Sequence, residues 1–104
     1  MLSIRFAEGA EHEWWVSSTV FERLFSSAIA HAQIPAALEE WRHIAAANGG
    51  LSFEEDEREA RDALMHGLRE AAHAELARLG EVDLRSADGT YKVSLEKLLA
   101  ISHG

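Results

Sequence analysis

The stretch that decides the fold runs from Leu51 to Gly80 and reads LSFEEDEREARDALMHGLREAAHAELARLG. Ser52 and Glu55 have the spacing of a capping box, in which each side chain accepts a hydrogen bond from the other residue's backbone N–H. Gly80 is the residue type that most often follows the end of a helix, because it adopts a left-handed backbone conformation without strain. The sequence therefore predicts one long central helix, about 52–79.

Apolar residues recur in this stretch with the period of a helix and mark the face expected to be buried. A helix of this length measures roughly 40 Å at about 1.5 Å per residue. A compact domain of this size has a radius of gyration of about 13 Å, so we expect the helix to span the whole domain. The apolar stripe comprises Phe53, Ala60, Leu64, Gly67, Leu68, Ala71, Ala72, Leu76 and Leu79, and the opposite face carries Glu55, Glu59, Asp62, His66, Arg69, Glu70 and His73.

The residues before this helix predict two short strands and two shorter helices. Residues 2–7 alternate apolar and polar side chains, which is typical of a half-buried strand. A polar turn at 8–13 leads to a second strand at 14–16, where adjacent tryptophans Trp14 and Trp15 would point to opposite faces, leaving one exposed. A helix is predicted over 19–33 from a capping box of Thr19 and Glu22, and another from Pro35 to the Asn48-Gly49-Gly50 break.

After Gly80 the sequence favours a β-hairpin followed by a short helix. Val82 and Leu84 alternate with charged residues, 86–89 resembles a turn, and 90–93 is rich in β-forming residues. Ser94 is the predicted N-cap of the last helix. The predicted fold is a single mainly helical α+β domain, 1–104, with three to four helices around the long central helix (about 52–79). A small antiparallel sheet would combine the N-terminal strand with the C-terminal hairpin.

The charge balance limits the classes of partner. The chain has 18 acidic and 10 basic residues, a net charge of −8. Direct nucleic-acid binding is not expected, because it requires a basic face to neutralise phosphates. The chain lacks cysteine, a secretory signal and the run of about 20 apolar residues needed to cross a bilayer, so we expect a cytoplasmic protein without membrane contact. Eight of the ten basic residues are arginine and alanine is frequent, which is typical of a GC-rich bacterial genome.

The sequence contains no recognisable catalytic motif. It has no cysteine nucleophile, no serine in a Gly-x-Ser-x-Gly turn and no glycine-rich phosphate loop. No cofactor is expected. The alternative that remains open is a small metal-dependent hydrolase using His66, Glu70 and His73, which share one helix face at spacings of four and three. His66 and His73 would lie about 10 Å apart along the axis, so a solvated polar face is the simpler interpretation.

The densest group of charges is the acidic run at the start of the long helix. Acidic residues in a first turn complement the helix dipole, but Glu59 and Asp62 continue the acidic edge beyond that turn. We therefore interpret the edge, together with a spare tryptophan, as a partner-binding surface. Its predicted residues are Glu54, Glu55, Asp56, Glu59, Asp62, Trp14 and Trp15.

The leading functional hypothesis is a small, non-enzymatic bacterial protein that neutralises a basic protein partner by occlusion. An immunity protein, an antitoxin or a phage-encoded inhibitor would act in this way. Besides the hydrolase, a second alternative is a self-associating helical regulatory protein. The sequence leaves the oligomeric state and the identity of the partner open, because exposed apolar surface cannot be measured from it.

Overall fold

The computed structural model describes residues 1–7 and 12–101, and in this part the chain forms four α-helices, two 3₁₀ turns and three strands. This is the mainly helical α+β class that the sequence predicts. Residues 8–11 of the predicted polar turn lie outside the described residues. In chain order the elements are β1 (Leu2–Arg5), β2 (Glu13–Val16), α1 (Ser18–Ala30), η2 (Ala36–Leu38), α2 (Glu40–Asn48), β3 (Gly50–Leu51), η3 (Glu55–Glu57), α3 (Arg58–Leu79) and α4 (Ala87–Ile101).

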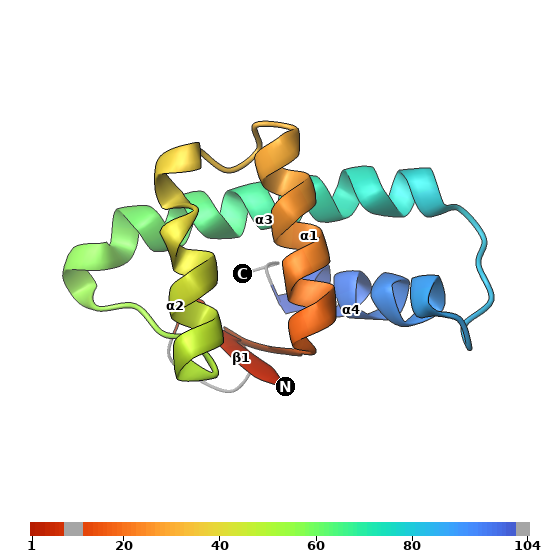
Figure 1. The fold of residues 1–104 in the computed structure, drawn as a ribbon, viewed down its shortest axis with the longest axis horizontal. Coiled ribbons are helices and arrows are strands. Elements are labelled where there is room, and N and C mark those ends of the chain that lie inside the picture. The colour runs from red at the N-terminus through yellow and green to blue at the C-terminus, as the bar shows by residue number, and fades with distance from the viewer. Residues whose placement is uncertain (8–11, 102–104) are drawn as a thin grey trace.

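Helix α3 is the central element, and Figure 1 shows it running along the longest dimension of the molecule, which measures 41 Å. It packs against α1 and α4 through the predicted stripe, with Leu64, Leu68 and Ala71 buried. The α1–α2 connection crosses this helix at Gly67, where an added Cβ would lie 2.4 Å from the carbonyl oxygen of Gln33. A glycine is required at this crossing because real Cβ atoms essentially never approach a backbone oxygen so closely.

The start of the long helix differs from the predicted capping box at Ser52. The capping box lies two residues later, where the side chains of Glu54 and Glu57 each accept a hydrogen bond from the other's backbone N–H. Glu55–Glu57 form a 3₁₀ turn before α3. The delay has a physical cause: Leu51 is hydrogen-bonded into the sheet, so the chain is still extended when it passes Ser52.

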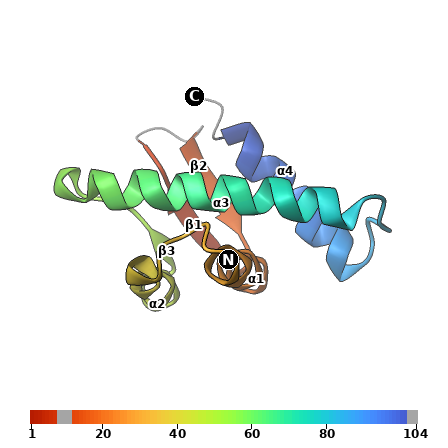
Figure 2. The ribbon, with the colours of Figure 1, turned by 90° about the horizontal axis from the view of Figure 1, so that it is seen from above.

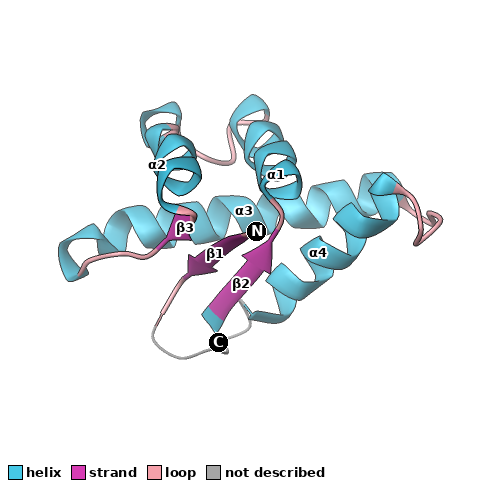
Figure 3. Ribbon diagram, turned by 60° about the horizontal axis from the view of Figure 1, so that its bottom comes forward, coloured by secondary structure: helices cyan, strands magenta, loops and turns pink. Residues whose placement is uncertain are grey.

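The sheet is mixed, with strand order β2-β1-β3 (Figure 3). Strands β1 and β2 are antiparallel, with Ile4 opposite Trp14, whereas β3 runs parallel to β1 and places Leu51 opposite Ile4. The predicted wholly antiparallel sheet is therefore wrong. Gly50 is needed in β3 because a Cβ there would lie 2.1 Å from the carbonyl oxygen of Ser3.

The predicted C-terminal hairpin is also wrong, because the chain from Ala87 to Ile101 forms the helix α4. The side-chain oxygen of Ser86 accepts a hydrogen bond from the backbone N–H of Gly89 at 3.0 Å, as an N-cap does. Tyr91, Leu95 and Leu98 follow at helical spacing and are fully buried. Ser94, the predicted cap, lies inside this helix and donates to the carbonyl oxygen of Thr90.

Helices α1 and α2 lie side by side on the same side of α3, and Figure 2 shows both nearly end on. Helix α1 is 18–30 rather than 19–33, because Ser17, not Thr19, accepts the capping hydrogen bond from the backbone N–H of Val20. Pro35 precedes the 3₁₀ turn η2, and α2 ends at Gly49 with a left-handed φ of 72°. The predicted break at Asn48-Gly49-Gly50 is therefore confirmed.

Buried side chains from the sheet and from all four helices form one hydrophobic core. The buried face of the sheet contributes Leu2, Ile4 and Trp14, while Ser3 and Trp15 lie on the opposite face because successive strand side chains alternate. Within the described residues, no helix is long and apolar enough to cross a membrane.

Candidate functional site

The predicted acidic edge forms an exposed ridge at the start of α3, which we call the acidic ridge: Glu54, Glu55, Asp56, Glu59 and Asp62. These residues follow one another through η3 and the first turns of α3, at one end of the long axis in Figure 1. All five side chains are exposed. Glu54 is partly engaged by its capping role, so the outward charge of the ridge comes mainly from the other four.

Only one of the five carboxylates of the acidic ridge forms an ion pair within the described part of the chain. Among the described residues, Asp62 forms an ion pair with Arg61 at 3.0 Å, but Glu55, Asp56 and Glu59 have no ion-pair partner there. Three unpaired carboxylates within five residues maintain a negative potential in the adjacent solvent. The structure thus places these predicted site residues on one accessible surface.

A hollow of about 560 Å³ lies beside the ridge, between the end of β1 and the start of α3. Glu54 and Glu55 line it together with Arg5, Arg58 and Arg61. The two sides of the ridge therefore differ in charge. The side that faces the hollow carries both acidic and basic side chains, whereas Asp56 and Glu59 do not line the hollow. A cationic side chain would meet the least competing positive charge on the side away from the hollow.

The two tryptophans are separated as their adjacency predicts, but only one belongs to the surface. Trp14 is 0% exposed, and its indole N–H donates to the carbonyl oxygen of Ser94 at 3.0 Å. Trp14 is therefore corrected from a partner-binding residue to a core residue that ties β2 to α4. Trp15 is 58% exposed and is the tryptophan available to a partner.

Trp15 is one of four exposed large apolar residues in the described chain, and all four line a single hollow of about 360 Å³. The others are Met1, Leu84 and Val93, which are 82%, 65% and 36% exposed. We call these four residues the Trp15 patch. The sequence predicts only Trp15 as part of this surface. Leu84 and Val93 fall in the predicted hairpin, and only the observed course of α4 brings them to the same hollow as Trp15.

The alternative metal site gains no geometric support. His66, Glu70 and His73 lie on the exposed face of α3, as their spacing predicts. Across residues 1–7 and 12–101, no group of three or more His, Cys, Asp or Glu side chains is placed to hold a metal ion. A hydrolase using these three residues would therefore need a ligand geometry that this part of the structure does not provide.

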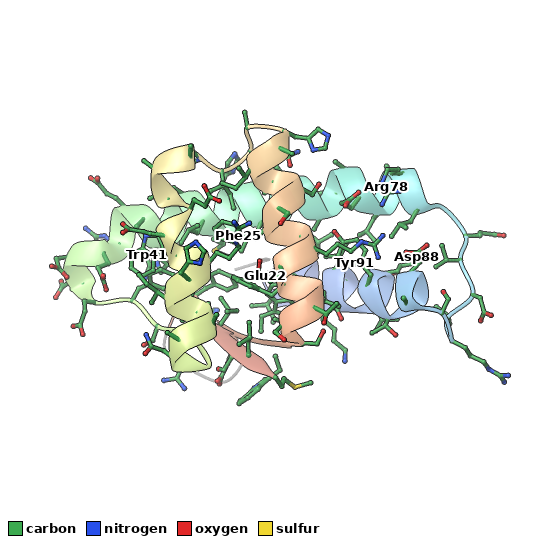
Figure 4. The ribbon with its side chains drawn as sticks, in the orientation of Figure 1. Glu22, Phe25, Trp41, Arg78, Asp88 and Tyr91 are labelled. Carbon is green, nitrogen blue, oxygen red and sulfur yellow. The ribbon has the colours of Figure 1, made fainter. Side chains whose placement is uncertain are left out.

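A polar cluster around the buried Glu75 and Tyr91 joins α1, α3 and α4, and the sequence did not predict it (Figure 4). The Tyr91 hydroxyl donates to one carboxylate oxygen of Glu75 at 2.9 Å, and Arg78 donates to the other at 2.7 Å. The guanidinium of Arg23 lies 3.9 Å from the centre of the Tyr91 ring and pairs with Asp88 at 2.9 Å. Glu75 lies four residues after Ala71 and four before Leu79, so helical spacing places it on the apolar stripe. An acidic residue on that stripe was the available signal, but its partner Tyr91 lies 16 residues away and cannot be identified from the spacing.

The pKa shifts of Glu75 and Tyr91 indicate that the two groups stabilise the fold and do not act as an acid–base pair. Burial alone would raise the pKa of Glu75, but hydrogen bonds from Arg78 and Tyr91 outweigh it and lower that pKa below its usual value. Burial, reinforced by the hydrogen bond to Glu75, raises the pKa of the Tyr91 hydroxyl. Because the carboxylate is held ionised and the phenol protonated, proton transfer between them is disfavoured.

No family model, curated protein or solved structure matches the chain.

Proposed function

We propose that this chain is a non-enzymatic bacterial protein that binds a basic protein partner in the cytoplasm and neutralises it by occlusion. An immunity protein, an antitoxin or a phage-encoded inhibitor works in this manner. The observation that carries the proposal is the set of three exposed carboxylates of Glu55, Asp56 and Glu59, which have no ion-pair partner among the described residues. A net charge of −8 extends their field and makes a cationic protein the favoured partner.

The position of the ridge, in η3 and at the start of α3, suits binding without rearrangement. Helix α3 is anchored in the core by Leu64, Leu68 and Ala71, and the chain before the ridge is paired in the sheet at Leu51, so both ends of the ridge are held in place before a partner arrives. A preformed surface loses little conformational entropy on binding. Exposed ion pairs contribute only about 0.2 to 1 kcal/mol each, so the main effect of the ridge is to speed and orient the encounter with the partner.

The decisive experiment separates the position of the charges from their number. The ridge variant carries Glu55→Gln, Asp56→Asn and Glu59→Gln, which changes the net charge from −8 to −8 + 3 = −5. Loss of three favourable interactions with the helix dipole, each worth about 0.3 to 1 kcal/mol, should lower its stability by about 1 to 3 kcal/mol in total. Its fold is checked by circular dichroism before use.

A matched control removes three acidic side chains that are exposed elsewhere and have no ion-pair partner among residues 1–7 and 12–101. These are Glu70, Glu81 and Glu96, each replaced by Gln. The control variant has the same net charge as the ridge variant, −8 + 3 = −5, but keeps the acidic ridge intact. Any difference between the two variants therefore reports on the ridge and not on total charge.

Each tagged protein is used to capture partners from a lysate of the bacterium that encodes it, with quantification by mass spectrometry. The proposal predicts a basic protein recovered equally by the native chain and the control variant, and depleted at least about fivefold with the ridge variant. Addition of one equivalent of native chain should then inhibit the isolated partner's activity. Equal capture by all three proteins, or a bound partner that stays fully active, would overturn the proposal.

A further inference from the structure

The Trp15 patch gathers side chains from segments that are distant in the sequence. Met1 precedes β1, Trp15 is in β2, Leu84 lies in the connection between α3 and α4, and Val93 is in α4. Scattered single apolar residues on a surface are ordinary, but a contiguous exposed group around a hollow marks an interaction site. We propose that the Trp15 patch is the interface through which two copies of this chain form a two-fold symmetric dimer.

The size of the patch matches the apolar part of a small dimer interface. A large apolar side chain has about 150 to 200 Å² of surface when fully exposed. Multiplied by this area, the exposed fractions of the four residues give roughly 400 Å² of exposed apolar surface. A standard interface covers about 800 Å² on each partner, of which about 57 to 65% is apolar. The patch therefore supplies most of the apolar area that such an interface needs, and its surroundings supply the polar rim.

The charges around the patch permit contact between two acidic chains. Of the nine residues that line the hollow, Lys97 has the only charged side chain and none is acidic. Contact between two copies through this patch therefore does not require acidic side chains to face one another. Two acidic ridges brought together would instead place like charges in contact, which is unfavourable.

The shape of the patch is compatible with binding to itself. In a two-fold interface the same surface is used on both copies, so each surface must provide both a projection and a recess. Met1, Trp15 and Leu84 are each more than half exposed and are the side chains available to project from this surface. The recess is the 360 Å³ hollow beside them. In the dimer, the projecting side chains of one copy would occupy the hollow of the other.

Dimer formation would leave the acidic ridge free. The hollow beside the ridge and the hollow of the Trp15 patch share no lining residue. Figure 1 places the start of α3 and the 80–86 connection at opposite ends of the long axis. This inference therefore stands or falls independently of the proposed partner.

The test is sedimentation equilibrium of the purified 104-residue chain from about 10 µM to about 1 mM, a range that covers weak dimers. The native protein should show an average mass rising from 11.5 kDa toward twice that value. Leu84→Asp places a charge in the apolar centre and should raise the dissociation constant at least about tenfold. Trp15→Ala removes the largest projecting side chain and should act in the same direction.

The matched control is Ala37→Asp, which adds the same charge at an exposed position of η2 outside the patch. It should dimerise as the native protein does, within about threefold after allowance for one added charge. Circular dichroism confirms that each variant is folded. A native protein that keeps the mass of one chain up to about 1 mM, or equal association of the Leu84→Asp and native proteins, would overturn the inference.

Discussion

The hydrogen bond between Tyr91 and Glu75 should contribute measurably to stability, and Tyr91→Phe isolates it. The substitution removes only the hydroxyl that donates to Glu75 at 2.9 Å, while the ring keeps its place in the core and its contact with Arg23. A hydrogen bond to a charged group is worth about 1.5 to 3 kcal/mol. Because Arg78 still donates to the other carboxylate oxygen, we expect a loss near the lower value, about 1.5 kcal/mol.

The loss should depend on pH in a defined direction. The pKa of Glu75 is lowered in the folded state from its ordinary value of 4.5, so the unfolded chain takes up a proton first as pH falls. The stabilisation from the ionised carboxylate is therefore fully present above about pH 4.5 and is lost as pH falls through the lower folded pKa. The difference between native and Tyr91→Phe proteins should accordingly shrink in acid.

Urea denaturation at pH 7 and at about pH 3 measures both effects, provided that the fold persists at the lower pH. Thermal unfolding at pH 7 gives a second value, with an expected decrease in Tm of about 6 °C at about 4 °C per kcal/mol. A Tyr91→Phe protein within about 0.5 kcal/mol of the native one at pH 7 would refute the reasoning. An equal loss at both pH values would show that the hydroxyl matters for a reason other than the ionised carboxylate.

Three further predictions concern α3, and each is measured by urea denaturation. Leu68→Ala should destabilise the fold by about 2 to 5 kcal/mol, because the side chain is buried in the core; a change of under about 0.5 kcal/mol would place it on the surface. Gly67→Ala should also destabilise the fold, because the added Cβ would lie 2.4 Å from the Gln33 carbonyl oxygen. This clash should outweigh the gain of about 1 kcal/mol in helix propensity that alanine has over glycine. A gain in stability would contradict the close packing at Gly67. His66→Ala and His73→Ala should change stability by less than about 0.5 kcal/mol. Both variants should also leave the metal content of the purified protein, measured by mass spectrometry, unchanged. Loss of a stoichiometric metal would instead support the hydrolase alternative.

The central helix was predictable because its pattern is long and local. Over 22 residues of α3, the apolar positions keep helical spacing through Leu64, Leu68 and Ala72, and a strand period does not fit them. The end at Gly80 was equally clear. The start was not. Ser52 and Glu55 match the capping-box pattern, whereas the observed box begins at Glu54, which is not a preferred N-cap residue type. The pairing of Leu51 with β1 is what keeps the chain extended past Ser52.

The C-terminal part was predicted wrongly because two local signals favoured a hairpin. Asp88-Gly89 is a frequent turn pair, and the following residues have high β propensity. The competing signal was the helical spacing of Tyr91, Leu95 and Leu98, which the burial of all three in the core makes decisive. The contact of Tyr91 with Glu75 is a tertiary interaction, and no pattern within 80–93 reports it.

The acidic ridge and the Trp15 patch differ in how much the sequence reveals. Consecutive acids on one helix end are visible in the sequence, so the grouping of the ridge residues was predicted. Which of their carboxylates form ion pairs depends on where Arg5, Arg58 and Arg61 lie. The adjacency of Trp14 and Trp15 predicts opposite orientations, but the sheet face that packs on the core identifies Trp15 as the exposed one. Strand β3 could not be predicted from the sequence, because its two residues are too few to show the alternation of apolar and polar side chains that marks a strand.

The acidic ridge is proposed to guide a basic partner to this protein, and the dependence of the association rate on salt concentration tests this role. Once the partner is captured, stopped-flow mixing compares the native chain, the ridge variant and the control variant at low and high ionic strength. At low salt the ridge variant should associate about tenfold more slowly than the other two. The difference should shrink at high salt, because exposed charges are screened over about 8 Å at physiological ionic strength and over less above it. Equal rates for the native chain and the ridge variant at low salt, or an equal slowing of both variants, would contradict the account.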